Sequence, residues 1–358
     1  MKIIQVMPFF GLGGAETMCE NLVYELVKMG HEVIVLSLYD KRTAITQRFV
    51  EANIDIRYLN KKSGFDFSMY KKLYNIFKQE NPDVIHTHIY TTKYVFPVAV
   101  KLKIKVVHTV HSIATKEMSK TSRMFNKFFY KHFNVIPVAL SEKIKKTIVD
   151  EYMLAPVNVP VIFNGIDLKK CRIKTSYDKG ETFRIVHVGS FLEVKNHIGL
   201  IDAFEIFHKK YPNSELHLIG DGEKKKQIEQ IVFQKGLSKC VKFYGLQSNV
   251  HLFLSDMDIF TLTSLYEGIP MSIIEAMGTG MPIVATAVGG VPDMLDINSA
   301  QLVTVDTNAI ASAFEKYYFD QDLRKTHGKK ALEVSKLFSA QVMADNYLKI
   351  YQGASGTL

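Results

Sequence analysis

The sequence predicts an α/β protein with two doubly wound parallel sheets, and three observations support this. Short β-branched runs alternate with longer amphipathic stretches, as in parallel strands joined by crossover helices. The alternation restarts after 169–181, a polar segment without a clear period. The chain has 358 residues, enough for two domains. We expect one Rossmann-like domain over 1–165 and a second over 166–339.

The expected strands are short runs rich in Val and Ile. In the first half they lie at 2–7, 32–38, 54–59, 84–88, 105–108 and 135–139, with helices at 15–29 and 69–79. In the second half they lie at 183–188, 215–219, 241–244, 259–262 and 283–285, with helices at 197–210 and 224–235. A last helix at 340–352 follows the second sheet, so the segment 340–358 is free to pack back on the first domain.

The composition excludes several classes of protein. Hydrophobic residues make up 47% of the chain, which is too apolar for a disordered protein. Cys19, Cys171 and Cys240 are odd in number and far apart, which argues against a disulfide framework or a zinc ribbon. The apolar run 3–10 contains Pro8 and leads into glycines, unlike a secretory signal. We expect a reduced, cytoplasmic protein that can associate with the inner face of the cell membrane.

The net charge of +9 belongs almost entirely to the first half. Residues 1–168 hold 23 Lys and Arg against 15 Asp and Glu, whereas 169–358 hold 22 against 21. Nucleic acid is not expected, because the basic residues accompany no recognised binding module. Within 119–134 a helix would gather phenylalanines on one face and cations on the other. That helix could lie on an anionic membrane surface or pack on the first sheet, and both alternatives stay open.

A glycine-rich loop joins the first strand to the first helix. It reads Gly11-Leu12-Gly13-Gly14-Ala15-Glu16, and its glycines let backbone amides approach a ligand at the helix N-terminus. A dinucleotide fingerprint needs a third glycine where this chain has Glu16, although Asp40 could still bind a ribose. A dinucleotide site and a glycine turn without a ligand therefore both remain alternatives for this loop.

The most informative segment runs from Ser264 to Gly278. Glu267 is expected in the loop before a helix, Pro270 at its first turn, and Glu275 within it. Each carboxylate can accept sugar hydroxyls, and two of them beside an anion site suit a nucleotide sugar. The amides of Met271 and Ser272, at the positive helix end, can face the phosphate. Taken alone, the pair has an ordinary alternative: a capping Glu and a solvated helical Glu.

Further motifs make the chain resemble a known family. Glu267 and Glu275 match the Glu-seven residues-Glu signature of the retaining glycosyltransferases of family 4, which have the two-domain GT-B fold. The other motifs follow in register: Gly13-Gly14-Ala15-Glu16, His111, Asn164-Gly165-Ile166-Asp167, Val188-Gly189 with Lys195-Asn196, Gly220-Asp221-Gly222-Glu223, and Gly289-Gly290 with Pro292. The resemblance covers nearly the whole chain. It implies an N-terminal acceptor-side domain and a C-terminal nucleotide-sugar-binding domain that face an interdomain cleft.

The resemblance also implies roles for individual residues. Glu267, His111 and Lys195 would be catalytic: Glu267 and His111 would contact the donor sugar, and Lys195 would neutralise the leaving diphosphate. Glu275 would hold the donor ribose. The remaining donor-binding positions would be Gly14, Gly189, Ser190, Leu246, Met271 and Ser272, and the acceptor-side positions Gly13 and Glu16.

One position departs from the family pattern. Many relatives have an arginine directly after the glycine that precedes the phosphate lysine, and this chain has Ser190 there. A serine cannot reproduce the bidentate clamp of a guanidinium. We therefore expect Lys195 to carry more of the anionic load, or another cation such as Lys116 to supply it.

Four histidines lie at the ends of two neighbouring strands: His86, His88, His108 and His111. Strand periodicity places His86 and His88 on one face, so a metal site is an alternative. No carboxylate cluster accompanies them, and the resemblance implies no metal. We expect hydrogen-bonded histidines, with no metal and no cofactor.

By resemblance, the sequence predicts a retaining, metal-independent hexosyl- or N-acetylhexosaminyltransferase. It would move a sugar from a nucleoside diphosphate sugar, with a UDP-sugar expected, to a glycan or lipid-linked acceptor in bacterial surface polysaccharide synthesis. Two alternatives remain: a catalytically silent GT-B partner subunit, and a nucleotide-sugar hydrolase or epimerase on the same fold.

Overall fold

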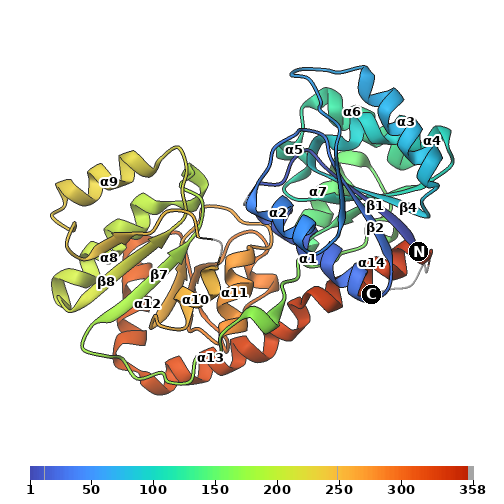
Figure 1. Cartoon of the computed structure of the whole chain (residues 1–358). Coiled ribbons are helices and arrows are strands. Elements are labelled where there is room, and N and C mark those ends of the chain that lie inside the picture. The colour runs from blue at the N-terminus through green and yellow to red at the C-terminus, as the bar shows by residue number, and fades with distance from the viewer. Residues whose placement is uncertain (12, 248, 354–358) are drawn as a thin grey trace. The chain divides into compact units, whose positions relative to one another are not determined.

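The computed structural model describes residues 1–11, 13–247 and 249–353, and the chain divides into two compact units (Figure 1). Met1–Gly165 and the C-terminal helix α14 (Ala340–Gln352) form one unit, and Ile166–Ser339 forms the other. Each unit contains one six-stranded sheet. The chain therefore has two α/β halves, and its last helix belongs to the half in which the chain began.

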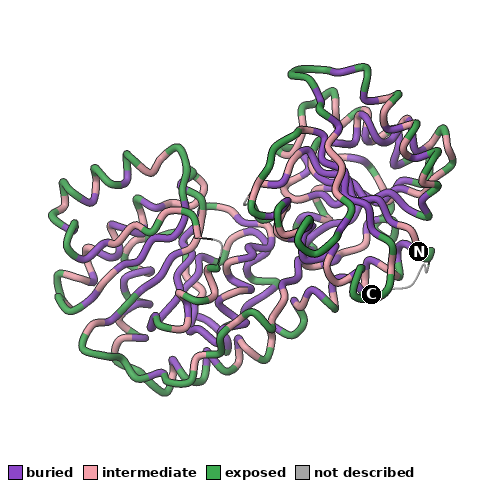
Figure 2. Tube along the Cα trace, in the orientation of Figure 1, coloured by how far each residue is buried: buried purple, intermediate pink, exposed green. Residues whose placement is uncertain are grey.

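The first sheet has the order β3-β2-β1-β4-β5-β6, and all of its strands are parallel. The order reverses between β1 and β4, and ligands of doubly wound sheets bind at the carboxyl edge near such a reversal. The central strands are almost wholly buried (Figure 2). The strands are β1 (Lys2–Met7), β2 (Glu32–Ser37), β3 (Asp55–Tyr58), β4 (Val84–His88), β5 (Lys105–Val110) and β6 (Val135–Ala139).

Helices cover this sheet. They are α1 (Gly14–Lys28), α2 (Ala44–Glu51), α3 (Ser68–Glu80), α4 (Thr92–Lys101), α5 (Ala114–Glu117), α6 (Lys120–His132) and α7 (Glu142–Tyr152). Helix α14 packs against α1, as Figure 1 shows, and buries Tyr347 and Tyr351 in the core of this unit. Residues more than 300 positions apart in the sequence therefore share one core.

The second sheet repeats the scheme with the order β12-β11-β10-β7-β8-β9, again all parallel. Its strands are β7 (Phe183–Val188), β8 (Ser214–Ile219), β9 (Val241–Phe243), β10 (Ile259–Leu262), β11 (Ile283–Thr286) and β12 (Gln301–Val303). Its helices are α8 (His197–Lys210), α9 (Lys225–Gln234), α10 (Val250–Leu254), α11 (Met271–Thr279), α12 (Thr307–Phe319) and α13 (Gln321–Ser335). The predicted two-sheet fold class is confirmed.

Every strand and helix assigned from the sequence is present within two residues of its expected ends. The sequence did not predict β12, because it has three half-buried residues and no apolar run. The sequence analysis named only some of the connecting helices, and α2, α4, α7, α12 and α13 were not among them. In α4 the β-branched residues and the internal Pro97 obscure the helical period.

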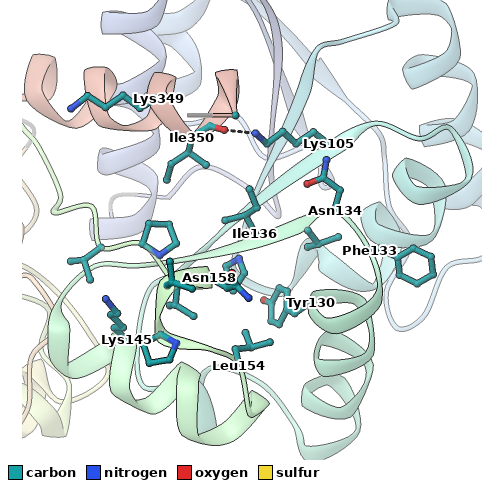
Figure 3. Close-up of a pocket in the computed structure, with 18 of the residues that line it drawn as sticks. Lys105, Tyr130, Phe133, Asn134, Ile136, Lys145, Leu154, Asn158, Lys349 and Ile350 are labelled. Atoms are coloured by element: carbon teal, nitrogen blue, oxygen red, sulfur yellow. Dashed lines mark hydrogen bonds between the residues drawn. The ribbon is translucent and has the colours of Figure 1, made fainter. Parts of the chain in front are cut away.

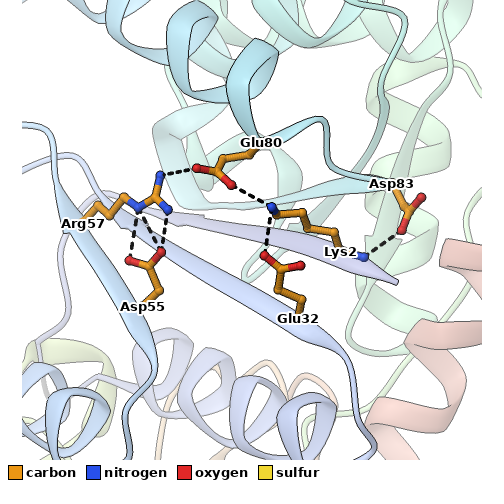
Figure 4. Close-up of polar contacts among 6 residues, drawn as sticks. All are labelled: Lys2, Glu32, Asp55, Arg57, Glu80 and Asp83. Atoms are coloured by element: carbon orange, nitrogen blue, oxygen red, sulfur yellow. Dashed lines mark hydrogen bonds and ion pairs between the residues drawn. The ribbon is translucent and has the colours of Figure 1, made fainter.

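An ion-pair network links the N-terminal ends of neighbouring strands in the first sheet (Figure 4). Lys2 Nζ lies 2.8 Å from Glu32 and 2.7 Å from Glu80. Arg57 contacts Glu80 at 2.8 Å and Asp55 at 2.6 Å, so β1, β2, β3 and the end of α3 are linked. Because these pairs are partly solvated, each contributes little to the stability of the sheet.

Helix α6 shows how the amphipathic segment 119–134 is placed. Phe125 and Phe129 pack on Phe96 of α4, with ring centroids 6.3 Å and 5.5 Å away. Phe128 and Phe133 remain 52% and 39% exposed. One part of the apolar face of α6 is therefore buried in the core, and another part is exposed to solvent.

Within the described residues, no helix combines the length and apolar composition needed to cross a membrane.

Candidate functional site

The second sheet brings Lys195 and Glu267 together at its carboxyl edge. Lys195 ends the turn after β7, and Glu267 lies between β10 and α11. Lys195 Nζ lies 2.6 Å from Glu267 Oε1, and the Ser264 hydroxyl donates to the same oxygen over 2.5 Å. The two charged side chains are only 18% and 9% exposed. Charge-assisted hydrogen bonds in so sheltered a place fix both groups. Ser264 opens the sequence motif, but its role was not predicted.

Backbone contacts hold the two loops of this pair in place. Asn196 adopts the left-handed conformation, with φ of 53°, which asparagine tolerates better than most residues. Its side-chain amide donates to the Thr263 carbonyl over 3.1 Å. The Leu265 amide donates to the Val194 carbonyl over 2.8 Å. The lysine loop and the glutamate loop are therefore joined on both sides of the ion pair.

Two motif glycines are required by close backbone contacts. Gly289 has φ of +59°, and a Cβ there would overlap the carbonyl of Glu267. Gly220 has φ of +141°, and a Cβ there would overlap the carbonyl of Gly189. The glycine motifs thus act as spacers that let neighbouring loops touch at the carboxyl edge.

Helix α11 starts immediately after the glutamate loop. Pro270 is its N-cap residue with extended backbone, not part of the first turn, which corrects the sequence interpretation. The Ile273 amide donates to the Pro270 carbonyl over 3.1 Å, so the amides of Met271 and Ser272 precede the first helical bond. These amides and the helix dipole favour an anion at this end.

Glu275 lies within α11, one helical turn after these amides. Its side chain is half-buried, and burial raises its pKa to about 7. Near neutral pH the carboxyl group is therefore a mixture of ionised and protonated forms. A carboxylate in this position can accept two neighbouring hydroxyl groups.

The predicted donor positions Gly189, Ser190 and Leu246 also lie at this edge, whereas the predicted donor position Gly14 lies in the first unit. Gly189 follows β7 directly and Ser190 is exposed beside it. Leu246 follows β9 and is 56% exposed; the preceding Gly245 accepts a hydrogen bond from the Gly220 amide over 2.9 Å. Lys224 lies against the Ser190 loop, because its amide donates to the Phe191 carbonyl over 3.0 Å and its ammonium pairs with Glu193 at 3.2 Å. The sequence did not indicate this cation beside Ser190.

In the first unit, His111 follows β5 and joins a buried polar chain. His111 Nε2 lies 3.1 Å from His88 Nδ1, and His88 Nε2 lies 3.0 Å from Gln5 Oε1. His86 Nδ1 lies 2.7 Å from the Tyr351 hydroxyl of α14. Burial holds the pKa of both His86 and His88 well below the usual histidine range, so both are neutral. The expectation of hydrogen-bonded histidines is confirmed.

His111 has a second polar neighbour that the sequence did not reveal. Its backbone amide donates to Glu117 Oε1 over 3.0 Å. Burial raises the pKa of Glu117 to about 8 and lowers the pKa of His111 to about 4. Glu117 is an acidic residue in an otherwise basic segment, which is the one signal that could have indicated it. Among the described residues, no group of three or more His, Cys, Asp or Glu side chains is arranged to hold a metal ion.

Ile89 shows that the backbone at the end of β4 is strained. It follows His88 directly and has φ of 53°, which is rare for a β-branched residue. Such a conformation is retained only where the surrounding structure imposes it, and it is common at functional sites. It lies where the chain leaves the sheet beside the histidines.

Glu16 covers the glycine loop of the first unit. A Cβ at Gly13 would lie 2.5 Å from Glu16 Oε2, and one at Gly11 would lie 3.4 Å from Oε1. Burial raises the pKa of Glu16, while hydrogen bonds from the backbone of Glu16 and Gly11 oppose that rise. Gly14 is the first residue of α1, and Leu12 lies outside the described residues. The protein's own carboxylate thus occupies the anion position of this loop, an arrangement that suits hydroxyl groups better than phosphate.

A pocket of about 910 Å³ lies elsewhere in the first unit (Figure 3). Lys105, Lys145 and Lys349 line it together with apolar side chains that include Phe133 and Val157. Lys105 begins β5, whereas His111 follows the end of that strand. The pocket is therefore not part of the histidine site.

Comparison with known proteins now defines the class. The family model "Glycosyltransferase Family 4" matches residues 12–170, and "Glycosyl transferases group 1" matches residues 172–334. The crystal structure of Anabaena HepE in complex with UDP and glucose has a TM-score of 0.86, with 19% identity, 99% of this chain and 100% of that chain covered. The fold is that of the GT-B glycosyltransferases, with two Rossmann-like halves.

The chain resembles glycosyltransferase family 4, as its motifs indicated, and the two family models each match one half of it. It is 24% identical to N-acetyl-alpha-D-glucosaminyl L-malate synthase of Bacillus anthracis, over 98% of this chain and 97% of that protein. It is 28% identical to UDP-Gal:alpha-D-GlcNAc-diphosphoundecaprenol alpha-1,3-galactosyltransferase of Escherichia coli, over 61% of each chain. Glycosyl transfer is therefore its activity, and the dinucleotide alternative for the glycine loop is not supported.

Proposed function

We propose that this glycosyltransferase is a retaining, metal-independent enzyme that moves a hexosyl or N-acetylhexosaminyl group from a UDP-sugar to a glycan or lipid-linked acceptor of a bacterial surface polysaccharide. The observation that carries the proposal is the sheltered Lys195–Glu267 pair beside the N-terminus of α11. The UDP in the HepE complex and the UDP-Gal in the name of the Escherichia coli relative support the choice of donor.

The donor half supplies positive charge where the leaving diphosphate needs it. Lys195 and the first amides of α11 would neutralise the charge that develops as the glycosidic bond breaks. Glu275 would accept the ribose hydroxyls, and Glu267 would hold a sugar hydroxyl while Lys195 and Ser264 orient it. This set of groups gives the protein a way to stabilise the leaving group without a metal ion.

Retention is proposed without a covalent intermediate. Glu267 Oε1 already accepts hydrogen bonds from Lys195 and Ser264, which suits a positioning role better than nucleophilic attack. The leaving phosphate would take the proton of the incoming hydroxyl group. His111 would stabilise the donor sugar from the first unit, and Glu16 would bind an acceptor hydroxyl.

The first unit is proposed to meet an anionic membrane surface through α6. Met124 and Phe128 are 65% and 52% exposed on this helix, and lysines flank them. Apolar insertion combined with lysine attraction is the usual mode of interfacial helices. A lipid-linked acceptor would be presented at that surface.

Vesicle sedimentation tests this part of the proposal. Binding to vesicles with phosphatidylglycerol should exceed binding to neutral phosphatidylcholine vesicles, and Phe128→Ser should weaken it about tenfold, since one inserted phenylalanine contributes about 1.5–3 kcal/mol. The matched control is Phe233→Ser, which removes another exposed phenylalanine, on α9 of the second unit. Equal binding of Phe128→Ser and the native chain would contradict this role of α6.

Product analysis tests the reaction itself. The chain should release UDP and form an α-linked product from an α-linked UDP-sugar only when a glycan or lipid-linked acceptor is present. Free sugar without an acceptor would indicate a hydrolase, and an isomerised donor would indicate an epimerase. A thermal-shift series with nucleoside diphosphates and their sugars should show selective stabilisation by the uridine compounds. The absence of a shift with any of them would contradict the donor assignment and indicate a silent subunit.

A further inference from the structure

The side chain of Gln5 lies at the centre of the hydrogen-bond chain that ends at His111. Its Oε1 lies 3.0 Å from His88 Nε2, and His88 Nδ1 lies 3.1 Å from His111 Nε2. On its other side, Gln5 Nε2 donates to the Tyr351 hydroxyl over 3.4 Å. Gln5 and His88 are 0% exposed. Water therefore does not compete for these partners, and the protein alone sets the direction of each hydrogen bond.

The side-chain amide of Gln5 sets which atom donates and which accepts in each hydrogen bond of this chain. An amide oxygen only accepts, so His88 must present a proton to it from Nε2. The buried His88 is neutral, because burial holds its pKa well below the usual range. Its Nδ1 is then an acceptor, and His111 must donate to it from Nε2. In neutral His111 the remaining ring atom, Nδ1, carries no proton.

We infer that Gln5, acting through His88, is a positioning residue that holds neutral His111 in the Nε2-protonated tautomer and keeps Nδ1 as a hydrogen-bond acceptor. Within the described residues, Nδ1 of His111 makes no hydrogen bond to the protein. The consequence for transfer rests on the proposed function: Nδ1 accepts a hydrogen bond from a sugar hydroxyl. The opposite tautomer would present an N–H group at the same place and would repel that hydroxyl proton.

A contact from the C-terminal helix opposes reversal of the Gln5 side-chain amide, in which its oxygen and nitrogen would exchange places. The Tyr351 hydroxyl accepts from Gln5 Nε2 and lies 2.7 Å from His86 Nδ1, to which it donates when His86 carries its proton on Nε2, 2.8 Å from Thr109 Oγ1. Cys19 Sγ lies 3.9 Å from Gln5 Oε1 and adds a weak donor on the oxygen side. With the amide reversed, an N–H group of Gln5 would face His88 and the His111 tautomer would change. Tyr351 is therefore the residue of α14 on which the tautomer depends.

Nitrogen-15 NMR of the full-length protein tests the inference directly. Histidines are labelled with nitrogen-15, and the long-range proton–nitrogen spectrum of the ring atoms is recorded without substrate. A His111→Asn sample assigns the signals of this ring. We expect neutral His111 with its proton on Nε2. A proton on Nδ1 in the native chain would overturn the inference.

Two tyrosines of α14 provide a matched pair of variants. Tyr351→Phe removes the hydroxyl that orients Gln5, whereas Tyr347→Phe removes one that contacts Thr109, with 2.7 Å between the oxygens. Tyr351→Phe should populate both tautomers and lower kcat about tenfold with little change in the donor KM, as for other residues that orient a functional histidine. Tyr347→Phe should leave the tautomer and kcat unchanged, because Thr109 Oγ1, 2.8 Å from His86 Nε2, can still accept a hydrogen bond from that ring. Equal effects of the two variants would assign them to helix packing and overturn the inference.

His111→Ala separates this inference from the proposed function. If that variant kept full transfer activity while folded, the proposed role of His111 would fail and the tautomer measurement would still stand. If His111→Ala lost activity while the native ring carried its proton on Nδ1, the role would stand and the control by Gln5 would fail. The melting temperature of every variant is measured alongside its activity.

Discussion

The carboxyl edges of the two sheets carry different kinds of polar group: an ion pair in the second sheet and neutral hydrogen-bonding groups in the first. At the edge of the second sheet an ammonium and a carboxylate lie 2.6 Å apart and remain partly open to solvent. In the first sheet, by contrast, neutral histidines, the Gln5 amide and the Tyr351 hydroxyl form a hydrogen-bond chain. Most of this chain is buried away from solvent. Charge suits an anionic diphosphate, whereas neutral groups with fixed donor and acceptor roles suit sugar hydroxyls. This contrast supports the proposed function, in which the second half would bind the diphosphate and the first half would contact hydroxyl groups.

The largest expected effect follows from removal of the Lys195 ammonium group at the carboxyl edge of the second sheet. Lys195→Ala should lower kcat by about 10²–10³, the usual loss when one preorganised group that stabilises developing charge is removed. It should also destabilise the protein by about 1–3 kcal/mol, because Glu267 loses a buried partner. Steady-state kinetics and chemical denaturation measure the two effects.

Lys209→Ala is the matched control for Lys195→Ala. Lys209 is an exposed lysine that pairs with Glu205 on α8, with 72% of its side chain in solvent. This variant should change neither kcat nor stability measurably. If Lys195→Ala resembled it, the assignment of charge to the second edge would be wrong.

A smaller effect is expected from substitution of Gly289, which lets its loop contact the Glu267 loop. Gly289→Ala combines a positive φ with an overlap on the Glu267 carbonyl, so the free energy of unfolding should fall by about 2–4 kcal/mol. Gly30→Ala also has a positive φ, of +85°, but faces open space and should cost about 1 kcal/mol. Urea titration compares the two. Equal losses would show that backbone conformation matters at Gly289 and loop contact does not.

The smallest effect concerns Glu275, which adds a titrating charge to the second edge. Its pKa of about 7 means that the ionised form grows as the pH rises through neutrality. UDP-sugar binding should therefore strengthen from pH 6 to pH 8 by about tenfold, since one pH unit below the pKa leaves about a tenth of the group ionised. Isothermal titration calorimetry measures this slope.

The contribution of Glu275 to stability has the opposite sign. The folded-state pKa lies above the usual 4.5, so the folded state binds the proton more tightly. Stability from this group is lost as the pH rises from about 4.5 through 7. Glu275→Gln should flatten the pH dependence of both binding and stability; persistence of the full binding slope in this variant would assign the slope to another group.

Much of the fold could be predicted because its strands are locally encoded. The strands 2–7, 84–88 and 183–188 are short segments that contain β-branched residues, and the structure places them where the sequence predicted. The sequence did not reveal β12, which has no apolar run, and several connecting helices were not named, α4 among them. For the site, the glycine spacers and the two glutamates followed from motif spacing. Glu117 and the role of Ser264 did not, because each acts through a contact with a loop elsewhere in the chain.

By itself, the sequence determined the class of this protein: two α/β halves, a glycosyltransferase motif set, and a positive excess in the first half. Only the tertiary structure decided which side chains meet. Lys195 and Glu267 are 72 residues apart, and Gln5 and Tyr351 are 346 apart. Local propensity acts over a few residues, whereas these contacts depend on strand order and on the return of α14 to the first sheet. A hydrogen bond also needs atoms within about 3 Å, a precision that packing sets.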